Sequence, residues 1–433
     1  MKLKAIAQTV SLSALGLAMA IPAQAAFIED SKASLELRNF YMNRDFRNNP
    51  TTSNHKAEEW AQGFLLRYES GFTEGTVGVG VDAYGFAGLK LDGGGGTDGT
   101  GLLPVRKSGK SPHTSYGELG ATFKAKLSNS VLKAGTLMPK LPTVSSGDSR
   151  LLPQTFTGTH VNSQEINGLT IDLGRLNRVN QRNSTDRQPI YAWVSQNSSV
   201  HKKGVTVDKN LKTSKFDFGG ISYNWSQFGP DLKTGYNYAK MNDVYKQHIL
   251  NGVYTLPITD GQALTLDLRY ARTKEDGNSN IDNKAISSMV SYKLGHSNFA
   301  LGYQKMSGDT GYAYIAETDP FLVNYVQVRD FASTDEKSWQ ARFIHDFASI
   351  GVPGLTLMTR YIRGSNIYTA ADRNNGKAWE RDTDIGYVFQ DGALKGLGVK
   401  WRNATVRANV PVSGGATKID ENRLIVSYTI PLM

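Results

Sequence analysis

Apolar and charged side chains alternate with a period of two along residues 27–46, FIEDSKASLELRNFYMNRDF. Leu35 and Leu37 occupy odd positions, whereas Arg38 and Arg44 occupy even positions. Side chains two residues apart lie on the same face of a β-strand, so this segment predicts a strand with one apolar face and one charged face. If the apolar face contacts lipid, the charged face lines a water-filled space.

The same alternation recurs along the rest of the chain. Further segments with a period of two are residues 61–72, 76–89, 116–127, 130–138, 166–173, 190–196, 215–225, 231–241, 247–257, 262–273, 285–294, 298–306, 338–347, 355–363, 385–389, 396–407 and 423–432. Short turns such as 228–230 and 295–296 separate some of them, and long polar loops such as 308–337 and 364–382 separate others. Outer-membrane barrels combine short turns with long loops and close with an even number of strands. The pattern predicts an all-β fold, a transmembrane antiparallel β-barrel of about 18 strands.

The composition agrees with a barrel whose strands are apolar on one face only. Hydrophobic residues make up 39% of the 433 residues, while glycine (44) and tyrosine (20) are abundant. No apolar run after residue 25 approaches the length of about 20 residues that a spanning helix needs. A soluble all-β protein, such as a propeller or β-helix, is the alternative, but the sequence has no fixed repeat of about 40 to 50 residues. The chain has no cysteine, so disulfides and thiolate metal sites are excluded.

The N-terminus has the pattern of a secretory signal peptide. Lys2 and Lys4 precede a run of apolar and small residues at 5–21, and Ala23-Gln24-Ala25 is a small-x-small cleavage pattern. A membrane-anchoring helix is the weaker interpretation, because polar residues interrupt the run and Pro22 ends it. We therefore expect residues 1–25 to be a signal peptide and residues 26–433 to be one barrel domain in a Gram-negative outer membrane, in contact with its lipid and lipopolysaccharide.

The formal net charge of the chain is +10, and removal of Lys2 and Lys4 would leave 10 − 2 = +8. A basic excess favours anionic partners. Nucleic acid is one such partner, but the sequence carries no nucleic-acid-binding motif and the predicted export argues against it. We expect small anionic or zwitterionic solutes instead, and no nucleic acid.

Many of the basic residues have the inward parity of their strands. The predicted inward residues are Arg38, Arg44, Arg67, Lys124, Arg269, Arg342, Arg360, Lys400, Arg402 and Arg423. If the first strand pairs with the last one, Arg38 and Arg44 lie beside Arg423 and one wall of the pore is basic. A guanidinium binds a carboxylate through two parallel hydrogen bonds, so such a wall predicts carboxylate-bearing solutes. The alternative is that these arginines pair with lumen carboxylates, such as Glu36 and Asp384, and only stabilise the barrel.

The longest irregular segment, residues 139–164, contains three prolines and many small polar residues. Loops longer than about 15 residues are usually functional or disordered. In a wide barrel such a loop can fold inward, so residues 145–157 and 179–187 are candidates for a constriction.

The histidines and serines of the chain give little support to an enzyme. A barrel-embedded hydrolase would need a serine, a histidine and an aspartate within hydrogen-bond distance, but no G-x-S-x-G elbow marks a nucleophile. No pair of the seven histidines has the spacing of metal ligands on one element. We expect no enzymatic activity, no metal and no cofactor.

Four stretches carry a family resemblance: FIEDSKASLELRNFYMNRDFR, KAEEWAQGFLLRYESGFTEGTVGVGVDAYG, SGDSRLLPQTFTG and GDTGYAYIAETDPFLVNYVQVRDFASTDEKSW. They resemble the outer membrane carboxylate channels, or OprD-type porins, and the resemblance spans the whole mature chain. It implies an 18-stranded barrel with inward-folded loops that form a narrow constriction, an arginine ladder for carboxylates and a weak homotrimer.

The resemblance also implies individual ladder residues. Arg150 and Arg182 fall on the constriction loops, and the remaining candidates are Arg44 on the first strand and Arg381, Arg402 and Arg407 near the end of the chain. Asp309 and Asp148 are the acidic residues expected to face the ladder. Arg381 and Arg407 have the outward parity, so each needs a bulge or a rim position to line the pore.

One branch of the family takes basic amino acids, and another takes aromatic or cyclic carboxylates. The short segment GTHVNSQEINGLT and the modest loop lengths resemble the second branch more closely. Our hypothesis is therefore a porin for aromatic or cyclic carboxylates, with uptake of basic amino acids as the alternative.

Overall fold

The computed structural model describes residues 27–47, 55–106, 111–195, 202, 205, 207, 211–369, 374–412 and 415–433. The predicted signal peptide, residues 1–25, lies outside these ranges and stays a prediction. Within them, no helix is long and apolar enough to cross a membrane.

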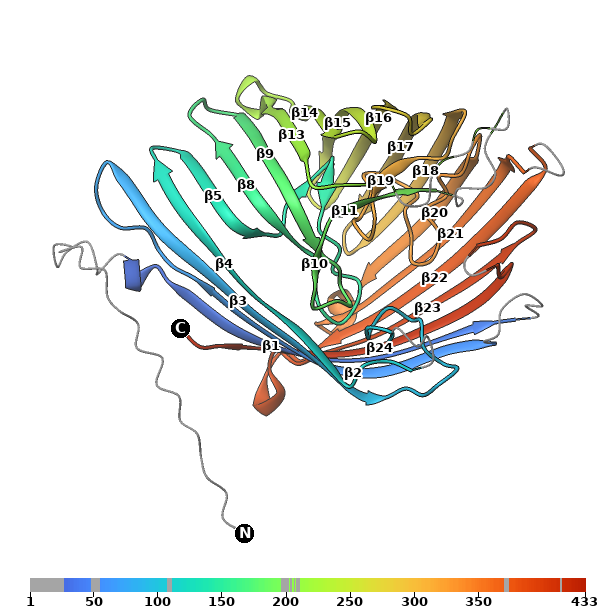
Figure 1. The fold of residues 1–433 in the computed structure, drawn as a ribbon, viewed down its shortest axis with the longest axis horizontal. Helices are drawn as coiled ribbons and strands as arrows, with labels where there is room; N and C mark the ends of the chain where they lie inside the picture. Colours follow the sequence, from blue (N-terminus) through green and yellow to red (C-terminus); the bar gives the residue numbers. More distant parts are fainter. Residues whose placement is uncertain are drawn as a thin grey trace, which may run out of the picture.

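Eighteen strands form the wall of a closed antiparallel barrel (Figure 1). In chain order they are β1 (Lys32–Phe46), β2 (Lys56–Glu69), β3 (Val77–Asp92), β4 (Ser115–Leu127), β5 (Ser130–Leu137), β8 (Thr155–Ser163), β9 (Leu169–Asn180), β13 (Phe216–Asn224), β14 (Asp231–Met241), β15 (Tyr245–Thr259), β16 (Gln262–Glu275), β17 (Asp282–Leu294), β18 (Ser297–Gly308), β20 (Lys337–Asp346), β21 (Leu355–Ile367), β22 (Gly376–Val388), β23 (Gly398–Ala408) and β24 (Lys418–Pro431). Each strand pairs with its neighbours in the chain, and β1 pairs with β24 to close the wall. The prediction of an 18-stranded antiparallel barrel is confirmed.

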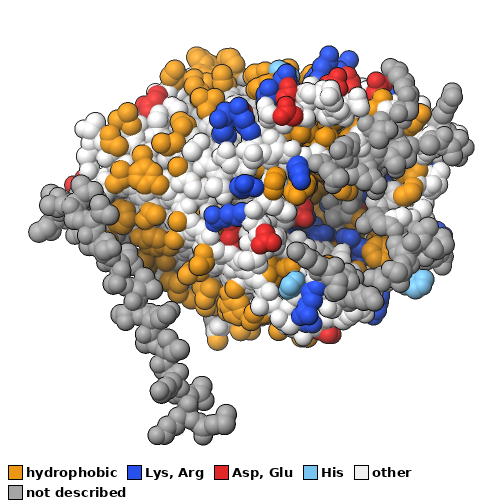
Figure 2. Space-filling view, in the orientation of Figure 1, with side chains coloured by type: hydrophobic (Ala, Val, Ile, Leu, Met, Phe, Trp, Pro, Cys, Tyr) orange, Lys and Arg blue, Asp and Glu red, His pale blue; other side chains and the backbone are white. Residues whose placement is uncertain are grey.

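The alternation of side chains places apolar residues outside and polar residues inside. On β4, Leu119 and Phe123 are 81% and 51% exposed on the outer face, whereas Thr122 and Lys124 are buried on the inner face. In the space-filling view, hydrophobic side chains gather over the left of the visible face, and charged side chains gather towards the right, where the long loops lie (Figure 2). A one-residue change of register would exchange these faces, so the lipid around the barrel fixes the register.

Aromatic side chains form rows on the outer face. Trp339, Tyr361 and Trp379 follow one another on β20, β21 and β22, with ring centroids 5.5 and 5.8 Å apart. Nearer the short turns, the rings of Phe299 and Phe343 lie 5.0 Å apart. A row of tryptophan and tyrosine rings of this kind is typical of a membrane interface of a barrel.

Three long loops fold into the barrel, and we call them L3 (residues 138–154), L4 (the described residues of the connection between β9 and β13, chiefly 181–195 and 211–215) and L7 (residues 309–336). L3 contains β6 (Lys140–Leu141) and β7 (Val144–Ser145), L4 contains β10 (Arg187–Gln188), β11 (Ile190–Val194) and β12 (Lys212–Thr213), and L7 contains β19 (Ala313–Ile315). β11 pairs with both β12 and β19, so L4 and L7 share a small sheet inside the wall (Figure 1).

Glycines in the wall make room for L3. Leu151 is fully buried, and a Cβ atom at Gly63 or Gly88 would lie 3.3 or 2.9 Å from its side chain. Leu151 belongs to an apolar cluster inside β1 to β4 that includes Phe40 and Leu65. Packing against the wall therefore holds the tip of L3 in place.

Three predictions about individual segments are wrong. Residues 376–382, predicted to belong to the polar loop 364–382, form the first part of β22, whose inner face carries the buried carboxylates Glu380 and Asp382 instead of uncharged residues. Residues 155–163, predicted to be part of a loop, form β8. The alternation did not reveal this strand, because its apolar Phe156 is buried inside the barrel and its polar Thr159 is exposed on the outer face. Residues 190–196, taken as a wall strand, contain β11, whose apolar Ile190 is buried inside the barrel. Within the predicted constriction segments 145–157 and 179–187, residues 145–154 and 181–187 do fold inward, whereas residues 155–157 and 179–180 belong to the wall strands β8 and β9. The inward folding of L7 was not predicted.

Candidate constriction site

Arg38 links the first strand to L3. Its Nη1 donates to Asp148 Oδ1 at 2.7 Å and to the carbonyl of Arg150 at 3.0 Å, while its Nε donates to Glu36 Oε1 at 2.8 Å. The Arg38 side chain is only 11% exposed, whereas the Asp148 side chain is 41% exposed. The carboxylate of Asp148 is therefore the part of this ion pair that water and solutes reach.

Three arginines surround one buried carboxylate where β1 meets β24. Glu421 Oε2 accepts from Arg44 Nη2 at 2.5 Å, and Glu421 Oε1 accepts from Arg423 Nε at 2.6 Å. Arg150 on L3 is near enough for its charge to act on both Arg423 and Glu421. One carboxylate cannot neutralise three guanidinium groups, so this part of the lumen carries an excess of positive charge.

Ser149 is the point where L3, L4 and the wall meet. Its Oγ accepts from Arg182 Nη1 at 2.6 Å, and its carbonyl accepts from Arg423 Nη1 at 3.3 Å. Arg182 Nε also donates to Glu317 Oε2 of L7 at 3.1 Å. Burial and the neighbouring charges of Arg423 and Arg182 lower the pKa of Arg150. Like charges are thus held close together by loop contacts.

The basic wall continues on β20, β21 and β23. Arg360 Nε donates to Asp382 Oδ2 at 2.7 Å, and Arg402 Nε donates to Asp384 Oδ2 at 2.9 Å. Arg342 lies opposite Arg360 in the β20–β21 register, and its buried Nε has no hydrogen-bond partner among the described residues. Arg342 is therefore a lumen arginine with unused hydrogen-bonding capacity.

Buried carboxylates hold L7 against this wall. Glu380 Oε1 and Oε2 accept from the backbone N–H groups of Val328 and Arg329 at 2.8 and 2.9 Å. Asp382 Oδ2 accepts from the N–H of Gln327 at 3.3 Å. The same wall therefore carries the arginines and anchors the loop that faces them.

Comparison with known proteins gives the family. The family described as outer membrane porin, OprD family, matches residues 25–432. The chain is 38% identical to Porin D of Pseudomonas aeruginosa over 464 aligned residues. The alignment covers 100% of this chain and 99% of Porin D. The chain belongs to the OprD family of outer-membrane porins.

Solved structures agree with this membership. The crystal structure of OpdQ from Pseudomonas aeruginosa matches this porin with a TM-score of 0.83 and 54% identity, over 95% of this chain and 100% of that chain. The crystal structure of OpdK from the same organism with vanillate matches with a TM-score of 0.83 and 35% identity, over 94% of this chain and 100% of that chain. The porin is thus an outer-membrane barrel, as the sequence predicts.

The structure places six of the nine predicted site residues on the lumen side of the porin. They are Arg38, Arg44, Arg150, Arg182, Arg360 and Arg402, which share the contacts described above. Several inward arginines also pair with carboxylates on their own or a neighbouring strand, including Arg402 with Asp384 and Arg269 with Asp267. These ion pairs agree with a role of the arginines in stabilising the barrel, which the sequence left open as an alternative.

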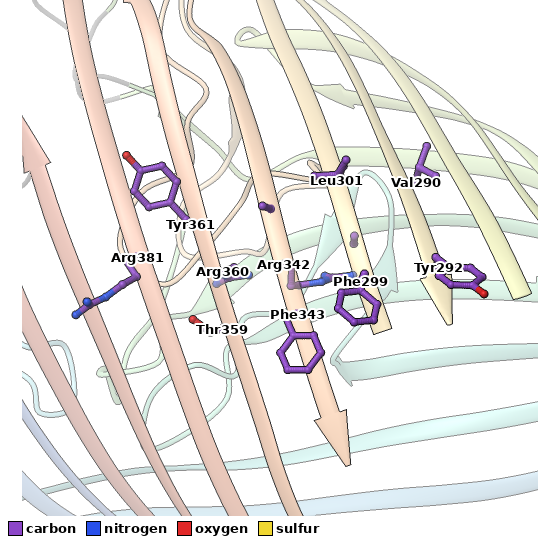
Figure 3. A pocket seen from close by; sticks show the side chains of 12 residues that line it. Val290, Tyr292, Phe299, Leu301, Arg342, Phe343, Thr359, Arg360, Tyr361 and Arg381 are labelled. Atoms are coloured by element: carbon purple, nitrogen blue, oxygen red, sulfur yellow. The ribbon is translucent and has the colours of Figure 1, made fainter. Parts of the chain in front are cut away.

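Arg381 and Arg407 do not line the pore, and their placement in the ladder is corrected. Arg381 alternates with the fully buried Glu380 and Asp382, and its Nη2 donates to Thr405 Oγ1 on the outer face at 3.4 Å. Figure 3 shows the Arg381 side chain extending away from Arg360 and Arg342. Arg407 pairs on the outer face with Asp420 at 2.7 Å. No bulge is present at either position, so strand parity decides where each side chain points.

Asp309 lies at the start of L7, directly after β18. Its backbone N–H donates to the carbonyl of Asp282 at 3.0 Å, and its own carbonyl accepts from the N–H of Lys202. Acidic residues that do contact the constriction arginines are Asp148, Glu36, Glu317 and Glu421. Glu317 and Glu421 were not predicted. Glu421 has the inward parity of the last strand and could have been found, whereas Glu317 depends on the path of L7.

A serine and a histidine do meet in the porin, but not in the arrangement of a hydrolase. Ser297 Oγ lies 2.9 Å from His345 Nδ1, and the other ring nitrogen faces Ser349 Oγ at 3.5 Å rather than a carboxylate. Among the described residues, no group of three His, Asp or Glu side chains is arranged to hold a metal ion.

Proposed function

We propose that this porin passes small solutes that bear a carboxylate, and that the lumen arginines select them. The observation that carries the proposal is the excess of guanidinium groups at the constriction, where Arg44 and Arg423 both donate to the carboxylate of Glu421 and Arg150 adds the charge of a third guanidinium nearby. A solute carboxylate that enters this space supplies the missing negative charge.

The arrangement can attract an anion without trapping it. Arg38, Arg423 and Arg402 stand on the adjacent strands β1, β24 and β23, and Arg360 and Arg342 continue the wall on β21 and β20. A carboxylate can exchange one guanidinium for the next, and the resident carboxylates compete with it at each step. A pore must bind its solute strongly enough to admit it and weakly enough to release it.

Aromatic or cyclic carboxylates are the proposed substrate class. Phe321 of L7 lies under Arg269, with 3.9 Å between the guanidinium carbon and the ring centroid, so an aromatic side chain already stacks on a lumen guanidinium. A flat solute ring can make the same contact with the arginines of the wall. The relative OpdK was crystallised with vanillate, an aromatic carboxylate. This relationship supports the aromatic class for the present porin.

Uptake of basic amino acids is the second candidate. A lumen cavity of about 740 Å³ is lined by three carboxylates, Asp172, Asp267 and Asp319, and also by the cations Lys140, Lys233 and Arg269. Arg269 binds Asp267, so Asp172 and Asp319 are the carboxylates that could attract an ammonium or guanidinium group of a solute. The two candidates differ in whether the solute needs a positive charge.

Single-channel recording of the refolded mature protein in a planar bilayer at low salt distinguishes them. We expect benzoate to interrupt the current, while the uncharged benzyl alcohol leaves it unchanged. Interruption by arginine alone would favour the amino-acid candidate, and equal effects of benzoate and benzyl alcohol would refute carboxylate selection. Low salt is needed because the Debye length falls from about 30 Å at 0.01 M to about 3 Å at 1 M.

A matched pair of variants tests the role of the wall. Arg342→Gln removes a guanidinium whose Nε lacks a described partner, whereas Arg269→Gln removes one that is bound to Asp267 through three hydrogen bonds. We expect the first variant to shorten benzoate interruptions and the second to change them less. An equal effect of both would mean that overall charge, not the basic wall, controls the anion.

A further inference from the structure

Arg381 and Arg363 place two positive charges on the membrane-facing side of the wall. Arg363 on β21 lies between Trp339 and Trp379 in the strand register, and Arg381 follows Trp379 by two residues on β22. Tryptophan rings mark the level of a membrane interface. Because β22 runs from the long loops towards the short turns, Arg381 lies about 7 Å along the strand below Trp379, inside the outer half of the membrane.

Two lysines extend this charge towards the outer rim. Lys337 and Lys377 stand at the outer ends of β20 and β22, and both are exposed. Among the described residues, no ion pair involves Lys337, Arg363, Lys377 or Arg381. By contrast, Arg407 on the neighbouring strand is paired with Asp420. We call these four residues the outer basic patch.

An apolar groove begins at Arg381 and runs across the outer face. It has a volume of about 540 Å³, and its lining includes Ala341, with Phe343 and Phe299 on one side and Leu301 and Tyr361 on the other. The groove residues stand on the neighbouring strands β17, β18, β20, β21 and β22, and Figure 3 shows Arg381 at one end of the groove. The small side chain of Ala341 leaves a depression between larger neighbours.

Charge and shape together identify the occupant of this surface. Positive charge in an apolar layer is costly unless an anion accompanies it, so the outer basic patch requires an anionic partner at the level of the outer headgroups. A flexible acyl chain fits a narrow groove between aromatic side chains, whereas the convex wall of a second barrel would leave the groove empty. A lipid with both phosphate and acyl chains meets both requirements.

We propose that the groove and the outer basic patch form a binding site for lipid A, the phosphate-bearing acylated anchor of lipopolysaccharide in the outer leaflet. One acyl chain lies over Ala341 between the aromatic walls. A lipid phosphate accepts hydrogen bonds from the guanidinium groups of Arg363 and Arg381, and the two lysines contact the anionic sugar groups above. The site lies outside the pore and does not depend on which solute passes.

Binding of purified bis-phosphorylated lipid A to the refolded full-length barrel in detergent, measured by native mass spectrometry, tests the proposal. Arg363→Gln with Arg381→Gln should weaken binding roughly 30-fold, since each basic residue near a lipid phosphate contributes about fivefold. Ala341→Phe fills the groove and should also weaken binding while leaving every charge in place. Arg407→Gln removes a guanidinium from the same face and should change binding less than twofold.

Three results would overturn the proposal. Dephosphorylated lipid A could bind as tightly as the bis-phosphorylated form, or phosphatidylglycerol could bind as tightly as lipid A. Alternatively, the arginine variants could abolish an oligomer while lipid binding stays unchanged, which would assign the surface to a second copy of the chain. Unchanged single-channel conductance of each variant shows that the barrel has folded, so a loss of lipid binding is then attributable to the site.

Discussion

The ion pair between Arg38 and Asp148 leads to a prediction about how strongly the constriction holds an anion. Asp148 is the exposed member of the pair, and Arg38 keeps a second carboxylate partner in Glu36. Asp148→Asn therefore removes a negative charge from the lumen without leaving Arg38 unpaired. A partly exposed ion pair of this kind contributes about 1 kcal/mol or less to stability, so the variant should fold.

The effect on a bound carboxylate follows from Coulomb's law. A solute carboxylate that approaches Arg38 would lie about 6 Å from Asp148, where the repulsion is about 0.7 kcal/mol at the dielectric constant of water and about 2.8 kcal/mol at an effective value of about 20. Removal of the charge should therefore strengthen benzoate binding by a factor between about 3 and about 100. The carboxamide of the new asparagine keeps the shape of the side chain, so the change is one of charge.

Single-channel recording measures this effect as the length of benzoate interruptions. We expect longer interruptions in Asp148→Asn than in the unmodified porin at 0.01 M salt, and a much smaller difference at 1 M salt, because exposed charges are then screened. Arg38→Gln should act in the opposite direction. Shorter interruptions in Asp148→Asn, or a difference that persists unchanged at 1 M salt, would refute the electrostatic reasoning.

Three further predictions concern single residues. Arg360→Gln should destabilise the barrel by about 3 to 5 kcal/mol, because it leaves a fully buried aspartate without its cation, whereas Arg342→Gln should cost much less; urea unfolding in detergent compares them. Leu151→Ala should cost about 2 to 5 kcal/mol and raise the open-channel conductance by loosening L3, while Leu119→Ala on the exposed outer face should leave the conductance unchanged. Burial raises the pKa of Asp319, so this lumen carboxylate becomes neutral at a higher pH than an exposed aspartate does. Acidification from pH 7 to pH 5 should therefore increase the ratio of anion to cation permeability, and Asp319→Asn should reduce that pH dependence; a ratio that falls on acidification would contradict this reasoning.

The wall of the barrel could be predicted because lipid and water impose opposite requirements on its two faces. Leu119 and Lys124 are assigned correctly by parity alone, since each side chain is in the environment that its chemistry favours. Strand parity does not predict which residues face inward where loops enter the barrel. Phe156 and Ile190 are apolar yet lie on the inside, because L3 and L4 provide a second apolar surface there.

Strand parity predicts the positions of Arg381 and Arg407 better than the family resemblance does. Parity assigns Arg381 and Arg407 to the outer face, and the structure agrees, whereas the position of both in the ladder came from the resemblance. Strand parity does not predict contacts between loops. The pair of Arg182 with Glu317 joins residues 135 positions apart, and only the folded paths of L4 and L7 bring them together.

The sequence left two roles open for the lumen arginines, stabilising the barrel or binding the solute, and the contacts at Glu421 show how both can hold. Arg44 and Arg423 each donate to this carboxylate, so neither side chain is free to leave the wall. The carboxylate has one negative charge for two guanidinium groups, and Arg150 adds a third. The ion pairs that fix Arg44 and Arg423 therefore leave an unneutralised positive charge, because the two arginines share the one carboxylate of Glu421. A constriction with equal numbers of both charges would hold its shape equally well but would not attract an anion. The proposed preference for carboxylates therefore depends on the carboxylate that Arg44 and Arg423 share.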